Sequence, residues 1–134
     1  MRATGPGLVV TLVLDGQVFF TGTPSQETQK VDQMVDDNTP RDHLLEIILS
    51  GKCPEHTKLD AEGAIVQDRL LIVEDISLDQ VSLGQILHEK AVYCHDYNGT
   101  KPMVDGRFYG EMGCNGTVKL SFTSPIYLWL LENM

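Results

Sequence analysis

The sequence contains little of what marks a disulfide-rich, membrane-spanning or nucleic-acid-binding protein. Its three cysteines, at positions 53, 94 and 114, are odd in number and widely spaced, so they predict reduced thiols rather than a disulfide framework or a zinc site. The longest apolar runs, such as residues 126–131, are much shorter than the ~20 residues that a membrane-spanning helix needs. Basic residues are scarce as well, because 10 Lys and Arg stand against 19 Asp and Glu, for a net charge of −9. That imbalance argues against nucleic acids and anionic membranes as partners.

The N-terminus also lacks the successive charged, apolar and small-residue regions of a signal peptide, so we expect none. The sequence has no internal repeat and no low-complexity tract. Its 134 residues, 42% of them apolar, match the size and composition of one compact domain. We therefore expect a single domain over residues 1–134.

Two segments in the first half have the composition of strong β-strands. Residues 8–14 are rich in β-branched side chains and end at Asp15-Gly16, a pair that favours a tight hairpin turn. Residues 17–20 are then expected to return as the partner strand. Residues 43–49 are apolar on both faces, which predicts a strand buried on both sides. The polar residues between these segments, 21–41, predict a long loop.

The second half contains shorter elements and one further strong strand. Residues 70–83 have extended character up to Gly84, residues 85–88 suit one helical turn, and residues 91–93 suit a short strand. Residues 117–123 alternate between polar and apolar side chains, which predicts a strand with one buried face. The Asn-Gly pairs at 98–99 and 115–116 are typical of type I′ hairpin turns.

The C-terminal segment, residues 124–133, leaves two interpretations open. Ser124-Pro125 is typical of the start of a helix. The aromatic and branched residues that follow also suit a strand. We favour a short closing helix or turn.

Together these elements predict an all-β sandwich, because short strands separated by turns predominate and no alternating βαβ units occur. Local strand pairs combined with one long crossover loop favour jelly-roll-like connections. The expected fold is a jelly-roll-like β-sandwich that ends in the short helix.

The sequence offers no recognisable catalytic constellation. No serine lies in a Gly-x-Ser-x-Gly elbow. Cys94 and His95 are adjacent, so on a strand their side chains point to opposite faces. The four histidines show no metal-ligand spacing. We therefore expect a protein that is not an enzyme.

Two acidic loops are candidates for ligand binding. Asp60, Glu62 and Asp68 lie in the first, and loop carboxylates are the ligands that calcium prefers. In the second loop, Tyr97 lies between Asp96 and Asn98. An exposed ring beside a carboxylate and an amide can stack on a sugar and bind its hydroxyl groups. The alternatives are solvated acidic loops, with Tyr97 packed under its loop and Asn98 forming the turn.

Residues 67–79 read Gln-Asp-Arg-Leu-Leu-Ile-Val-Glu-Asp-Ile-Ser-Leu-Asp. This stretch resembles the Asp-Arg-x-Leu strand of calcium-dependent xylan-binding modules, which are small jelly-roll carbohydrate-binding domains. The resemblance covers about one strand and its loop, and it implies calcium as a cofactor with Asp68 as a ligand. Ser-Gly-Lys at 50–52 stands where those modules carry acidic and amide residues, so no other ligand is carried over.

Residues 113–133 resemble small proteins of marine, T4-like cyanophages. That resemblance implies a viral protein found in the host cytoplasm during assembly or in the virion, with other virion subunits or its own copies as partners. The first functional hypothesis is thus a non-enzymatic structural or recognition protein, with residues 126–131 as a contact patch if they are exposed. The second is a carbohydrate-binding module that binds a polysaccharide through Asp96, Tyr97 and Asn98.

Overall fold

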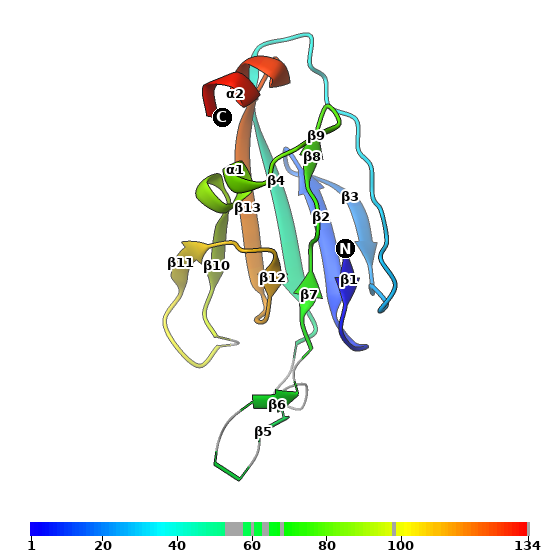
Figure 1. Ribbon diagram of the computed structural model, residues 1–134, viewed down its shortest axis with the longest axis vertical. Helices are drawn as coiled ribbons and strands as arrows, with labels where there is room; N and C mark the ends of the chain where they lie inside the picture. Colours follow the sequence, from blue (N-terminus) through cyan, green and yellow to red (C-terminus); the bar gives the residue numbers. More distant parts are fainter. Residues whose placement is uncertain (53–57, 60, 63–64, 68, 98, 134) are drawn as a thin grey trace.

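The computed structural model describes residues 1–52, 58–59, 61–62, 65–67, 69–97 and 99–133. These residues form an all-β, sandwich-like fold with a short C-terminal helix, which confirms the fold class predicted from the sequence (Figure 1). In chain order the elements are β1 (Arg2–Ala3), β2 (Val9–Leu14), β3 (Gln17–Gly22), β4 (Arg41–Ser50), β5 (Lys58–Leu59), β6 (Ile65–Gln67), β7 (Leu71–Ile72), β8 (Ser77–Leu78), β9 (Val81–Ser82), α1 (Gln85–Lys90), β10 (Val92–His95), β11 (Val104–Arg107), β12 (Glu111–Met112), β13 (Gly116–Ser124) and α2 (Ile126–Asn133).

The larger layer is a six-stranded sheet with the order β11-β10-β13-β4-β2-β3, in which every neighbouring pair is antiparallel. β2 and β3 are joined by Asp15 and Gly16, whose φ angles of 52° and 80° are the positive values that a type I′ turn requires. The hairpin predicted at this pair is therefore confirmed. The strands predicted over residues 43–49 and 117–123 are β4 and β13, which pair at the centre of the sheet.

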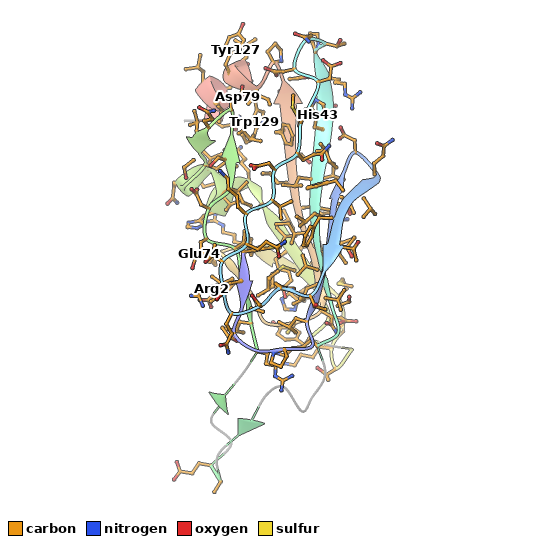
Figure 2. The ribbon with its side chains drawn as sticks, turned by 90° about the vertical axis from the view of Figure 1, so that its right-hand side faces the viewer. Arg2, His43, Glu74, Asp79, Tyr127 and Trp129 are labelled. Atoms are coloured by element: carbon orange, nitrogen blue, oxygen red, sulfur yellow. The ribbon has the colours of Figure 1, made fainter. Side chains whose placement is uncertain are left out.

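The smaller layer covers one face of this sheet. β1, β7 and β12 form its three-stranded sheet, and residues 25–29 run beside β1, where Ala3 N donates to Ser25 O and Gln29 N donates to Met1 O. α1 and the β8–β9 hairpin lie over the same face of the large sheet (Figures 1 and 2). The chain crosses between the layers several times, since β1, β7 and β12 belong to one layer and the intervening strands mostly to the other.

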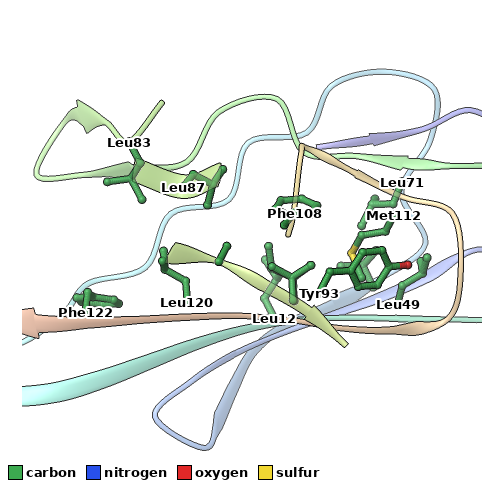
Figure 3. Packing of buried hydrophobic residues seen from close by; sticks show 14 of the residues in the cluster. Leu12, Leu49, Leu71, Leu83, Leu87, Tyr93, Phe108, Met112, Leu120 and Phe122 are labelled. Carbon is green, nitrogen blue, oxygen red and sulfur yellow. The ribbon is translucent and has the colours of Figure 1, made fainter. Parts of the chain in front are cut away.

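The hydrophobic core fills the space between the two layers (Figure 3). From the large sheet, alternate residues of each strand point into it, as period-two geometry requires. From the smaller layer and α1, Leu71, Leu87, Phe108 and Met112 face them. Phe108 and Met112 are fully buried. Burial of such side chains contributes about 1.5–3 kcal/mol each before the entropy cost of ordering them.

The C-terminal segment is a helix, so the favoured interpretation is confirmed. α2 begins directly after Pro125, and Ile126 N donates to Oδ1 of Asp37 at 2.6 Å. Asp37 lies in the long loop, and its carboxylate therefore takes the role of an N-terminal cap from a distant part of the chain. Trp129 packs edge-on against Phe122, with ring centroids 6.2 Å apart.

The Asn-Gly pair at 115–116 does not form the predicted type I′ hairpin, because neither residue has a positive φ and β13 begins at Gly116. Asn115 instead bridges to Lys52: its side-chain oxygen accepts from Lys52 N at 2.8 Å, and its amide nitrogen donates to Lys52 O at 2.9 Å. At position 116 a side chain would collide with the carbonyl oxygen of Cys94. Asn115 thus forms a side-chain bridge and Gly116 allows close packing of β13 against β10, so the pair does not form a turn. Asn98, in the other pair, lies outside the described residues.

The extended segment predicted over residues 70–83 is also interrupted. β8 and β9 form a tight hairpin whose two turn residues, Asp79 and Gln80, have φ angles of 50° and 64°. Neither residue is a glycine, so residues 79–80 lack the strong turn signal of an Asn-Gly or Asp-Gly pair. The helical turn predicted at residues 85–88 is confirmed as part of α1.

Candidate functional site

The loop between β10 and β11 is the sugar site predicted from the sequence, and in the structure the side chain of Asp96 stabilises the turn of this loop. Oδ1 of Asp96 accepts from Gly99 N at 2.9 Å, and the backbone oxygen of Asp96 accepts from Lys101 N at 3.1 Å. Such a side-chain-to-backbone bond is the usual role of aspartate in a turn. At least one carboxylate oxygen of Asp96 is therefore engaged within the loop.

Tyr97 is partly covered within the same loop. The residue is 41% exposed, and its φ of 54° lies in the left-handed region. Nζ of Lys101 lies 4.7 Å from the centre of the ring, and the ring of His95 meets it edge-on at 4.6 Å. The Tyr97 ring thus keeps only part of its surface for a ligand.

The metal ligand proposed by resemblance, Asp68, lies outside the described residues, as does Asn98. Among the residues that the structure describes, no group of three or more His, Cys, Asp or Glu side chains is placed to hold a metal ion. The β5–β6 pair and the β10–β11 loop lie toward the same end of the sandwich (Figure 1). A calcium site at that end therefore stays a prediction.

A second cluster joins Asp15, His43 and Ser124 with the connectivity of a nucleophilic triad. Nδ1 of His43 lies 2.7 Å from Oδ2 of Asp15, and Nε2 lies 3.1 Å from Oγ of Ser124. A carboxylate, an imidazole and a hydroxyl in this order are the arrangement that activates serine in unrelated hydrolases. No local sequence pattern marks the cluster, because Asp15 lies 28 residues and Ser124 lies 81 residues from His43 in the chain.

The hydrogen bonds around Ser124 give this cluster a structural role. Oγ of Ser124 donates to the carbonyl oxygen of Thr39 at 2.6 Å and accepts from Arg41 N at 3.2 Å. With its only proton used in this way, the hydroxyl can accept from His43 but cannot donate to it. Ser124 is also only 4% exposed. The cluster therefore ties the end of the long loop to β4 and β13 rather than presenting a nucleophile.

Asp15 completes the cluster as a charged anchor. Partial burial raises the pKa of its carboxyl group, but hydrogen bonds from His43, from Leu44 N and from Arg41 outweigh this and hold the pKa at about 2. Leu44 N and Arg41 Nη2 each donate at 2.8 Å. The ionised carboxylate thus connects the β2–β3 turn to β4.

The far side of the six-stranded sheet is a surface that the rest of the fold leaves uncovered. In the part of the chain that the structure describes, no layer lies against this side (Figures 1 and 2). We call it the outer face and define it by the strand residues that point away from the core: Val9, Thr11, Val13, Val18, Thr21, Asp42, Leu44, Glu46, Ile48, Ser50, Val92, Cys94, Asp105, Arg107, Thr117, Lys119, Ser121 and Thr123.

The outer face carries six aliphatic side chains, and none of them belongs to the core cluster or packs against it. Val18 is 61% exposed and Val92 is 38% exposed, while Val9, Leu44 and Ile48 are partly exposed. Val13 is 7% exposed, although no second layer covers it. β4, predicted from its sequence to be buried on both sides, is covered on one side only, and this prediction is wrong for the isolated chain.

The charges on the outer face nearly balance, in contrast to the strongly acidic chain as a whole. Three carboxylates stand with two cations, and the central pair is Glu46 on β4 and Lys119 on β13, which are register partners. Among the described residues, no ion pair involves either of them. The outer face is therefore close to neutral, with an unpaired acid and an unpaired base at its centre.

α2 exposes a second, smaller apolar surface. Its Ile126, Trp129 and Leu130 are buried, as packing on β13 requires. Tyr127 and Leu131, one turn apart, are 58% and 68% exposed. The segment expected from the sequence to be a contact patch is thus half buried and half exposed.

A groove of about 790 Å³ opens at the side of the sandwich, above apolar side chains from the inner faces of β2, β3, β4 and β13. Residues 28–33 of the long loop form one wall and residues 73–80 form the other. The carboxylate of Glu74 in the second wall already binds Nε of Arg2 at 2.9 Å. The groove is therefore the space between the two layers at the side where the long loop lies.

The chain matches no protein-family model, no curated protein and no solved structure. Neither α1 nor α2 has the length and apolar character to cross a membrane, and the described residues contain no other helix. The fold and the site thus define an all-β sandwich with one uncovered sheet face.

Proposed function

We propose that this protein is a non-enzymatic assembly component that binds a protein partner through the outer face of its six-stranded sheet. Following the resemblance in its C-terminal sequence, we place it among the structural or accessory proteins of a bacteriophage particle. The observation that carries the proposal is β4, whose sequence is apolar on both faces while the fold covers only one. A partner on the outer face would complete the burial of Leu44 and Ile48.

The outer face supports this role better than the other surfaces do. Exposed aliphatic side chains on a nearly neutral sheet face suit the packing of a second sheet about 10 Å away. The exposed part of α2 consists of a few side chains and is small for a stable interface. A non-enzymatic role is supported by the buried and hydrogen-bonded state of Ser124, the one described serine with a His-Asp pair.

Co-sedimentation with purified T4-like cyanophage particles tests the proposal, together with sedimentation of the protein alone. The variant is Ile48→Lys, which places a charge in the middle of the outer face. The matched control is Met34→Lys, because Met34 is 88% exposed and lies in the long loop. Thermal melting of both variants checks that they fold. We expect wild type and Met34→Lys to associate and Ile48→Lys to lose association at least tenfold, since unpaired buried charge is costly.

A wild-type protein that neither self-associates nor sediments with particles would contradict the proposal. Equal association of wild type and Ile48→Lys would show that another surface is used. A further variant, Leu131→Lys, then reports whether that surface is the exposed side of α2.

Carbohydrate binding at the β10–β11 loop is the second candidate, and the partly exposed ring of Tyr97 favours it. A glycan array with and without a calcium chelator tests it. Tyr97→Ala should abolish any signal, whereas Tyr109→Ala, at another exposed tyrosine, should leave it intact. A signal that Tyr97→Ala does not change would remove this loop as the site.

A further inference from the structure

We infer that the partner on the outer face is a second copy of this chain, packed face to face about a two-fold axis that runs along the strands between β4 and β13. This inference rests on the proposed function and names its partner. Two-fold dimers are the commonest protein assemblies, and their interfaces must be self-complementary. The side chains of the outer face meet that condition.

The self-complementarity is visible in the row of side chains that crosses the middle of the sheet. In this row, register partners on neighbouring strands follow one another in the order Val13 (β2), Glu46 (β4), Lys119 (β13) and Val92 (β10). Rotation about the axis between β4 and β13 reverses this order. Lys119 of one copy then lies over Glu46 of the other, and Val92 lies over Val13.

The neighbouring row obeys the same symmetry. Thr11, Ile48, Thr117 and Cys94 follow one another across the same four strands. The rotation places Ile48 over Thr117 and Thr11 over Cys94, so no like charges meet in this row. A lysine and a glutamate together can span the ~10 Å that separates packed sheets.

The size of the outer face also suits a dimer. The sheet has six strands, and its longest strand, β4, has ten residues. Because the other five strands have four to nine residues, strands ~4.8 Å apart with a rise of ~3.3 Å per residue give a face of ~600 Å². Stable interfaces bury ~600–1,000 Å² on each partner, so the face reaches the lower end of that range. The near-neutral charge of the face allows two chains of net charge −9 to approach on this side.

Charge reversal tests the inference, because the symmetry predicts a specific pattern of rescue. Glu46→Lys creates two Lys–Lys contacts in the dimer, and Lys119→Glu creates two Glu–Glu contacts. Each single variant should weaken dimerisation at least tenfold, since opposed like charges are strongly unfavourable. An equimolar mixture of the two single variants restores both Lys–Glu contacts and should dimerise like wild type. The double variant, Glu46→Lys with Lys119→Glu, should also dimerise.

The measurement is sedimentation velocity from about 1 μM to about 1 mM, a range that covers tight and weak complexes. Glu111→Lys is the control, because Glu111 is exposed on β12 in the smaller layer, and it should dimerise like wild type. A wild type that stays at the 14.9 kDa mass throughout would overturn the inference. So would single variants that dimerise normally, or a mixture that stays monomeric.

These outcomes separate the inference from the proposed function. If the wild type is monomeric but binds phage particles, and Ile48→Lys abolishes that binding, the outer face has a different protein as its partner. If Ile48→Lys changes neither self-association nor particle binding, the proposed function itself is wrong.

Discussion

Nε2 of His43 lies 3.1 Å from Oγ of Ser124, in a buried position where the hydroxyl also binds the backbone at Thr39 and Arg41. One serine side chain thus joins β4, β13 and the end of the long loop. The cluster resembles a catalytic triad only in its order of contacts, because the Ser124 hydroxyl donates its proton to the carbonyl oxygen of Thr39 rather than to His43. The cluster is expected to act on stability.

Ser124→Ala tests this role. The change removes the buried hydroxyl that contacts His43 Nε2, accepts from Arg41 N and donates to Thr39 O, which should lower the free energy of unfolding by about 1–3 kcal/mol. Urea denaturation followed by the fluorescence of Trp129 measures it. Thr123→Ala is the matched control, because Thr123 precedes Ser124 in β13 but points to the outer face. This control substitution should change the free energy of unfolding by less than about 0.5 kcal/mol. Equal effects of the two changes would contradict the structural role.

The pH dependence of stability should reveal Asp15. Its pKa is about 2 in the folded protein against 3.8 for the free side chain, so the folded state favours the ionised form. The stabilisation is complete well above pH 3.8 and disappears as the pH falls toward 2. Asp15→Asn should therefore be less stable than wild type at neutral pH, and the difference should shrink between these values. A difference that stays constant down to pH 2 would contradict the assigned pKa.

Two adjacent aromatic residues provide a test of the core. Phe108 is fully buried between the layers, whereas Tyr109 is 66% exposed. Phe108→Ala should lower the free energy of unfolding by about 3–5 kcal/mol, because it removes the ring and leaves a cavity. Tyr109→Ala should cost much less. Thermal denaturation of both variants makes the comparison, and similar losses would show that Phe108 does not lie where the structure places it.

Much of the large sheet could be predicted because its signals are local. Asp15-Gly16 marks a turn by backbone chemistry alone, and the alternation over residues 117–123 marks a strand with one buried face. The short elements of the smaller layer carry weaker signals. The turn at Asp79 and Gln80 has no glycine, and its strands span two residues each, so it could not be told from a continuous extended segment.

The functional features were harder to predict because they depend on contacts between distant segments. The cluster at His43 joins three separate parts of the chain. The Asn115-Gly116 pair predicts a turn, but the side-chain amide of Asn115 instead bridges to the backbone of Lys52. The apolar pattern of β4 predicts two covered faces, but the described chain covers only one, because a sequence pattern does not specify whether a covering layer comes from the same chain. The uncovered outer face could therefore not be predicted from the sequence.

Methyl NMR of the 14.9 kDa chain tests the central claim most directly, because it reports each surface separately. Spectra are recorded as the protein is concentrated and as phage particles are added. The account predicts that the methyl signals of Val13, Ile48 and Val92 shift or broaden, while those of Leu71 in the core and Leu131 on α2 stay unchanged. Shifts confined to α2 or to the β10–β11 loop, with the outer face unaffected, would contradict it.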